Sequence, residues 1–393
     1  MMNASLKNTI VILLTDSIMW GIWFGGMWSY RSVFAARLTD SYTHIAVSTA
    51  MPLAAASIIY IISSFYEDFI RRSRVVLFKI AIVISRAVYL LTSYTILSNL
   101  FDGLKLLYIA TVGFTIANTI SSLAGIAWAD YIADNIPPNF KSRYIALDSI
   151  LGTVGALIGT SIAGVILYET HSILSYGKLF MVVSAILLTN IPFLTVFVKE
   201  FTNTLTEYAN VQQSYSGKSA KRFYIAIIIV YLSINLPTSI MPPYIIHRFG
   251  GDEIWITLIN GANLMASLLA PMMWSMVVES MGSLNATKVA VALAIIVNVL
   301  FPYMSTLHLQ IIRGFLAGVA GIGIWVTLFN YLVKDVDAGR RISYIARVFT
   351  IQNLVPALAI NLGGVLADML SVPELVFMLS MVGFASLVLL KRI

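Results

Sequence analysis

The chain has 393 residues, of which 59% are hydrophobic and only 11% are charged, whereas soluble domains carry roughly 25% charged residues. This composition argues against a soluble fold. The absence of cysteine excludes disulfides and thiolate metal sites, and the net charge of +7 raises the question of an acidic partner.

Apolar runs recur along the whole chain, and each is long enough to cross a hydrocarbon core of roughly 30 Å as a helix. The runs are apolar on all sides, which disfavours barrel strands. We therefore predict an all-α membrane protein with twelve transmembrane helices, at residues 8–36, 43–70, 75–98, 105–133, 143–168, 176–199, 222–247, 253–280, 286–305, 308–334, 343–369 and 374–391.

Positive charges are unequally divided between alternate loops. If the N-terminus is cytoplasmic, the outer loops hold only Arg37, Lys105, Lys178 and Arg248, and the other loop cations lie inside. The positive-inside rule then predicts that both termini are cytoplasmic. The cations face anionic lipid in this arrangement, so membrane lipids are expected partners and nucleic acid is not.

The second half of the chain repeats the first at an offset of 200 residues. Tyr131 matches Tyr331, Tyr144 matches Tyr344, and Gly164 matches Gly364. Each pair has the same place in its half, which predicts two pseudo-symmetric six-helix bundles in the same membrane orientation. We place the bundles at residues 1–199 and 222–393, joined by a cytoplasmic linker loop at 200–221.

Three segments carry a resemblance to a known family. The loop "AWADYIADNIPPNFKSRYIALDS" at 127–149, the run "GALIGTSIAG" at 155–164 and the loop "SFYEDFIRRSR" at 64–74 together resemble the major facilitator superfamily. The resemblance covers essentially the whole chain. It implies a 12-helix secondary transporter, with the substrate between the halves and the cavity lined by spans one, two, four, five, seven, eight, ten and eleven.

The resemblance also implies a gate of charged residues on the cytoplasmic rim, where pairs part when the halves rock. Asp68 and Arg72 match the family's loop after span two, while Ser64 and Arg71 replace its glycines. The expected gate residues are Asp68, Arg72, Asp134, Arg143, Glu279, Arg340 and Arg341. The alternative is solvated loop charges, because exposed ion pairs contribute only about 0–1 kcal/mol.

Span one carries a possible cation and proton site. Asp16, Trp20, Trp23 and Met27 fall at i, i+4, i+7 and i+11, on one helical stripe. Indole faces attract organic cations, and desolvation beside them would raise the pKa of the carboxylate, so that proton release and substrate binding would compete. The alternative is that the stripe packs against a neighbour and that Asp16 pairs with a basic residue.

Other polar residues lie inside the spans. Asp148 is a second candidate for proton coupling or a part of the gate, and Arg86 in span three has no predicted role. Expected substrate-binding residues, besides Asp16, Trp20 and Trp23, are Asn118, Asn235, Asn260, Asn263, Trp325 and Asn353. For the amides the alternative is interhelical hydrogen bonding, and for Trp325 it is packing. Trp28, Trp128, Trp255 and Trp274 lie near span ends, which is typical of aromatic-belt anchors.

These observations predict a secondary active transporter of a small organic solute in the cell membrane, coupled to protons and working as a monomer. Export of amphipathic or cationic compounds is favoured by the aromatic stripe. Uptake of a polar, sugar-like or zwitterionic metabolite, and lipid translocation, remain alternatives. No catalytic, metal or cofactor motif occurs, so we expect neither an enzyme nor a cofactor.

Overall fold

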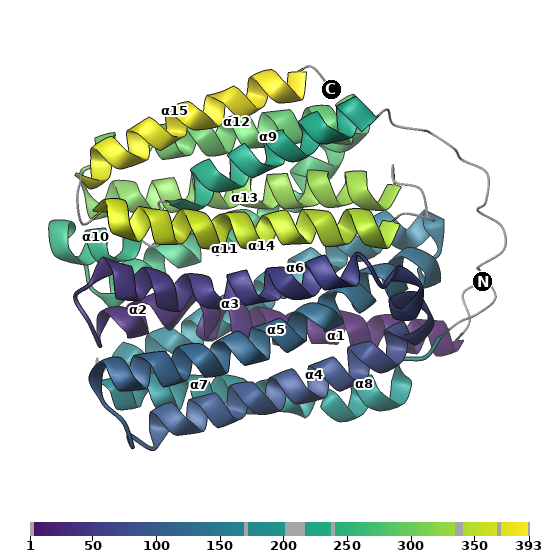
Figure 1. Ribbon diagram of the computed structural model, residues 1–393, viewed down its shortest axis with the longest axis horizontal. Helices are drawn as coiled ribbons and strands as arrows, with labels where there is room; N and C mark the ends of the chain where they lie inside the picture. Colours follow the sequence, from purple (N-terminus) through teal and green to yellow (C-terminus); the bar gives the residue numbers. More distant parts are fainter. Residues whose placement is uncertain are drawn as a thin grey trace.

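A computed structural model describes residues 4–168, 172–200, 217–236, 240–334, 341–367 and 371–391. Helices are the only regular elements in these ranges, and they run side by side along one axis (Figure 1). The start of α1 (Ala4–Gly26) and the end of α15 (Val372–Lys391) lie at the same end of the helices, which we call the terminal end, and α2 (Arg31–Ala36) and α10 (Met241–Phe249) lie at the opposite end.

Two sets of helices follow one another in the chain. The first set comprises α1 (Ala4–Gly26), the 3-10 helix η1 (Trp28–Tyr30), α2 (Arg31–Ala36), α3 (Tyr42–Ser63), α4 (Glu67–Leu97), α5 (Gly103–Asn135), α6 (Pro138–Tyr168), α7 (Ile173–Thr189) and α8 (Ile191–Phe197). The second comprises α9 (Gly217–Asn235), α10 (Met241–Phe249), α11 (Glu253–Met281), α12 (Ser283–Leu300), the 3-10 helix η4 (Phe301–Tyr303), α13 (Leu307–Lys334), α14 (Arg341–Ala367) and α15 (Val372–Lys391).

Within the described ranges, ten segments are long and apolar enough to cross a membrane, and Phe223–Asn235 and Glu374–Val388 are shorter apolar helices. These twelve segments correspond one to one to the twelve predicted spans, but some bounds differ. Span two ends at Ser63 rather than at residue 70, and span three begins at Glu67 rather than at residue 75. The prediction of an all-α, multi-pass membrane protein is therefore confirmed. The predicted linker falls largely on residues outside the described ranges, so the exact bundle boundaries and the cytoplasmic side of the termini stay predictions.

Several predicted spans are interrupted rather than continuous. Span seven divides into α9 and α10, and α10 begins just before Pro242 and Pro243, whose missing N–H groups cannot continue a helix. Span six divides at Asn190, and Pro192 follows in the first turn of α8. Span one changes to a 3-10 turn after Gly26, an interruption that the sequence did not predict.

Glycines bring α1 and α6 into backbone contact. A Cβ added at Gly155 would lie 2.1 Å from the carbonyl oxygen of Ile18, and one at Gly25 would lie 2.0 Å from that of Ala156. Small residues four apart allow this approach in membranes, where van der Waals packing drives helix association. The run "GALIGTSIAG" at 155–164 is thus a packing surface for α1.

The two halves meet chiefly where α3 packs against α14 and α6 packs against α11. Figure 1 shows α3 and α14 side by side at the middle of the molecule. Ala46 and Ala50 of α3 pack with Ala357 and Ile360 of α14 in one buried cluster. Any passage for a solute between the halves must therefore involve these helices.

Candidate functional site

Aromatic rings from both halves meet toward the terminal end. Trp128 of α5 stacks on Phe329 of α13 at 6.2 Å between ring centroids, and Phe329 stacks on Trp325 at 5.1 Å. Tyr60 of α3 meets Phe349 of α14 edge to face at 5.4 Å. We call these five residues the aromatic cluster. It closes the space between the halves about 5–15 Å from the helix ends, taking 1.5 Å per residue.

The opposite end is closed by a polar contact. The hydroxyl of Tyr30 in η1 lies 2.8 Å from the Thr257 hydroxyl of α11. A Cβ added at Gly164 of α6 would lie 3.5 Å from Cγ2 of the same threonine. Described residues therefore join the halves on both sides of the molecule's middle, as expected of an occluded conformation.

Asp16 is paired with a cation inside the first half. Its Oδ1 accepts a hydrogen bond from Nη2 of Arg86 in α4, and another, 3.1 Å long, from Nδ2 of Asn190. Arg86 is 4% exposed and also donates to the Leu187 carbonyl at 2.8 Å. The pair gives Arg86 a role that the sequence did not predict, and it neutralises the carboxylate.

The other residues of the predicted stripe differ in how far they are exposed. Trp23 and Met27 are 2% and 0% exposed, in a core cluster with side chains of α4 and α7. Trp20 is 42% exposed and stacks on Trp23 with 4.2 Å between ring centroids. Together with the Asp16 pair, this arrangement matches the packing alternative for the stripe.

Asp148 has a neutral partner. It lies on α6, half-buried, and its Oδ1 accepts a hydrogen bond from the hydroxyl of Ser17 on α1. It forms no ion pair with any residue in the described ranges, and it is close enough to Asp16 for the two carboxylates to interact electrostatically. The two residues predicted for proton coupling are thus neighbours on facing helices.

The predicted amides mostly bond to backbone. Asn118 donates from α5 to the Pro52 carbonyl of α3 at 2.9 Å, an interhelical bond inside the first half. Asn235 and Asn353 each donate to a carbonyl of their own helix, at 2.9 and 2.8 Å. Asn260 and Asn263 are half-buried on α11. Of these amides, the structure thus shows only Asn118 joining two helices.

Two tryptophans expected near membrane interfaces have other surroundings. Trp274 is 2% exposed, and its Nε1 donates to the Val319 carbonyl at 2.9 Å, so the belt assignment is wrong for this residue. A Cβ at Gly323 would lie 2.3 Å from the Trp274 ring, which shows how the indole is accommodated. Trp128 lies in the aromatic cluster, where predicted Trp325 also packs.

A cationic residue that was not among the predicted gate residues forms ion pairs with three carboxylates toward the terminal end. Arg74 of α4 is 3% exposed and lies 2.8 Å from Asp130 and 2.6 Å from Asp134, both of α5. Its Nη2 also pairs with Glu200, which follows α8. Of the predicted gate residues, Asp134 is thus paired within its own half.

The other predicted gate residues are at the surface or outside the described part. Asp68, Arg72, Arg143 and Glu279 are exposed, and Arg143 lies with its guanidinium 5.9 Å from the Phe140 ring centre. Arg340 lies outside the described residues, and for Arg341 only the helical backbone is described.

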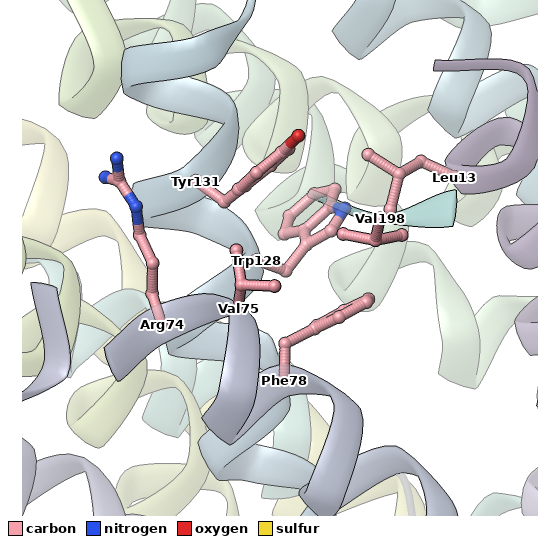
Figure 2. Close-up of a pocket in the computed structure, with 7 residues that line it drawn as sticks. All are labelled: Leu13, Arg74, Val75, Phe78, Trp128, Tyr131 and Val198. Carbon is pink, nitrogen blue, oxygen red and sulfur yellow. The ribbon is translucent and has the colours of Figure 1, made fainter. Parts of the chain in front are cut away.

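A cavity beside the Arg74 network is too small for a solute. Figure 2 shows Arg74, Tyr131 and Trp128 around it, with the Arg74 guanidinium pointing away from the apolar side chains. Its volume is about 10 Å³, at the lower limit of the roughly 10–15 Å³ that one water molecule needs. It lies inside the first half, so it is a packing defect rather than a binding site.

Comparison with known proteins bears on the fold. No protein-family model matches the sequence, and no curated protein sequence matches it significantly. The structure is similar to the human organic anion transporter MFSD10 (TETRAN), with a TM-score of 0.72, 11% identity and coverage of 99% of this chain and 100% of that one. It is also similar to a variant of the nucleoside transporter NupG, with a TM-score of 0.67, 12% identity and 99% coverage of both chains.

Both of these proteins are transporters of the major facilitator type. Near-complete coverage at these TM-scores confirms the predicted fold of two six-helix bundles. The low identities mean that the likeness concerns the fold, and function has to be argued from the site itself.

Proposed function

We propose that this protein is a secondary transporter that moves a small organic solute across the membrane by alternating access. The observation that carries the proposal is the pair of closures between the halves, by the aromatic cluster toward the terminal end and by Tyr30 and Thr257 at the opposite end. If one closure opens while the other holds, a site between them faces one side of the membrane at a time.

The closures suit a rocking motion because each is weak enough to break. The Tyr30 and Thr257 hydroxyls form one neutral hydrogen bond, which contributes only about 0.5–1.5 kcal/mol net. An aromatic pair adds about 0.5–1.5 kcal/mol beyond the area that it buries. Binding of a solute that prefers one open state can therefore shift the equilibrium between them.

We place proton coupling at Asp148 rather than Asp16. Asp16 already has a cationic partner in Arg86, so its protonation would leave that cation buried without its counter-charge. Asp148 accepts its hydrogen bond from neutral Ser17, and its protonation breaks no ion pair among the described residues. The preference for cationic solutes depended on an unpaired Asp16, so the proposal does not include it.

A disulfide at the opposite end tests alternating access, and the chain's lack of cysteine makes the test clean. In Gly164→Cys/Thr257→Cys the two side chains face each other, since a Cβ at Gly164 lies 3.5 Å from Thr257 Cγ2. We expect oxidation to abolish, and a reductant to restore, uptake into proteoliposomes of solutes drawn from anionic, cationic, zwitterionic and neutral classes. Each single variant under the same oxidant is the control.

The outcome that would refute alternating access is undiminished uptake by the fully cross-linked protein.

Asp148→Asn tests the proton coupling separately. We expect it to lose accumulation driven by a pH gradient while it keeps solute exchange at equal pH. Asp16→Asn is not a clean alternative, because it also breaks the pair with Arg86.

A further inference from the structure

A buried arginine in the first half has no counter-charge. Arg31, the first residue of α2, is 5% exposed and forms no ion pair with a residue in the described ranges. Its Nη2 lies 3.5 Å from the Thr49 carbonyl, the outer limit for a hydrogen bond. Its Nε and Nη1 are buried and have no hydrogen-bond partner.

Two further hydrogen-bond donors near Arg31 are also unsatisfied. The Tyr89 hydroxyl and the Trp23 indole Nε1 are buried without a partner, and each residue is 2% exposed. The Trp23 ring lies 5.2 Å from the rings of both Tyr89 and Trp28, and the Arg31 guanidinium lies 3.6 Å from the Trp28 ring centre. Unsatisfied groups thus gather at one place and all can donate.

The energetic balance points to a missing anion. A buried polar group without a partner costs about 1–3 kcal/mol, and a charged group costs more. Contact with Trp28 offsets part of this, since a desolvated cation over an indole gains about 2 kcal/mol. The remaining N–H groups of Arg31 match a carboxylate, which a guanidinium binds through two parallel hydrogen bonds.

The position of Arg31 gives a solute a route to it. Arg31 follows Tyr30, whose hydroxyl contacts Thr257 in the other half. It lies about 8 Å from Ala36, the last residue of α2, at 1.5 Å per residue. The Thr49 carbonyl precedes Ala50, which packs against α14. The helix that Arg31 begins, α2, also contacts α10 of the second half. Parting of the halves at the opposite end would therefore free this side of α2.

We propose that Arg31, with the Tyr89 hydroxyl and the Trp23 indole N–H, binds the anionic group of a small organic anion that enters from the opposite end. The rings of Trp28 and Phe114 beside the guanidinium suit a solute with an apolar or aromatic body. The inference rests on the proposed transport function and gives the transported solute its charge.

Benzoate is the probe, and benzamide, which has nearly the same shape without the charge, is its control. We expect benzoate, but not benzamide, to raise the thermal unfolding midpoint of the purified protein, because a ligand of the native state stabilises it. In Arg31→Gln we expect the apparent benzoate Kd to rise about tenfold or more, since hydrogen bonds to a charged group contribute about 1.5–3 kcal/mol. Arg31→Lys should keep part of the affinity, and Tyr89→Phe should weaken it slightly.

If Arg31 had a structural role, Arg31→Gln would lower the unfolding midpoint without benzoate. If Arg31 instead binds an anion, Arg31→Gln should leave this midpoint unchanged or higher, because it removes an unpaired buried charge. The matched control is Arg313→Gln in the second half. Arg313 is also buried, at 7% exposed, but its Nε bonds to Gln310 at 2.8 Å, so this variant should lose stability and keep its benzoate response.

Three results would overturn the inference: no response of the wild-type protein to benzoate, an equal response of Arg31→Gln, or a response to phosphatidylglycerol micelles without one to benzoate, which would assign the site to a lipid headgroup. Binding is measured without transport, so the two proposals fail separately. If the wild-type protein does not respond to benzoate but takes up another solute, the anion site alone is refuted. If it binds benzoate, but Gly164→Cys/Thr257→Cys shows no uptake of any solute that oxidation abolishes and a reductant restores, the transport proposal is refuted.

Discussion

Asp16 and Arg86 form an ion pair, and removal of either partner alone should destabilise the fold. Arg86 is almost completely buried, and Asn190 adds a second hydrogen bond to the same carboxylate oxygen. Removing one partner of a buried pair typically costs about 3–5 kcal/mol, while replacing both by apolar residues is often neutral. The pair therefore links α1 to α4 by a contact that is costly to break.

Asp16→Leu should accordingly lower the thermal unfolding midpoint strongly, because it leaves the Arg86 guanidinium buried and uncompensated. The double variant Asp16→Leu/Arg86→Met should recover most of the loss. Circular dichroism in detergent measures both. Equal losses in the single and double variants would show that the charge pair is not the source of the effect.

The carboxylates around Arg74 differ in exposure, and the difference predicts different costs. The Asp130 side chain is 2% exposed and that of Glu200 is 32% exposed. Arg74→Gln should cost about 3–5 kcal/mol, because it leaves Asp130 buried beside a neutral residue. Glu200→Gln should cost only about 0–1 kcal/mol, as for exposed pairs. Thermal unfolding of the two variants measures the difference, and similar costs would contradict it.

At the scale of elements, the contact between α1 and α6 depends on glycine. Backbone oxygens of α1 lie within 2.4 Å of the Cβ positions that alanine would add at Gly155 and Gly159. Backbone atoms cannot move aside as a flexible side chain can. The two helices must separate if either glycine gains a side chain.

Gly155→Ala should therefore destabilise the protein and reduce transport. Gly261→Ala is the matched control, since it lies inside α11 with no atom within 4 Å of the added Cβ. There alanine should be neutral or stabilising by up to about 1 kcal/mol, the usual difference in helix propensity. If the two variants behave alike in thermal unfolding, the close contact of α1 and α6 is not required.

Sequence reasoning located the helices but not all of their interruptions. Apolar length marks a span because a membrane requires it, and prolines such as Pro242 and Pro243 show where a helix such as span seven divides. The 3-10 turn after Gly26 has no proline, so no residue type indicated it. The position of Trp128 near a helix end suited a membrane-interface anchor as well as a contact between the halves. Only the packing of the halves places its ring against Phe329.

The candidate site was less predictable for a geometric reason. Arg74 pairs with residues 56, 60 and 126 positions away, and Arg86 pairs with one 70 positions away. Hydrophobic periodicity shows which residues lie in a span, but it does not show which helices are neighbours. Pairing of Asp16 with some basic residue could be anticipated, whereas the identity of that residue required the fold.

At the scale of the whole molecule, the aromatic cluster should hold the terminal end closed. Phe329→Ala removes the ring between Trp128 and Trp325, and we expect it to shift the population toward opening at that end. Spin labels at Tyr66→Cys and Glu279→Cys, two exposed positions near the terminal end, should then show longer distances. A label pair at Asp40→Cys and Arg248→Cys near the opposite end is the control. An unchanged distance distribution at Tyr66 and Glu279 would show that the cluster does not hold this end closed.

The glycine contact of α1 and α6 has a mechanical consequence. At their glycines the two helices meet backbone to backbone, with no side chain between them to absorb a displacement, so we expect them to move as one stiff unit. One end of this unit, at Gly164, contacts Thr257 across the halves, and Asp148 lies 16 residues along it, about 24 Å away at 1.5 Å per residue. A shift imposed at one face of the membrane would thus be transmitted directly to the carboxylate, without a chain of rearranging rotamers.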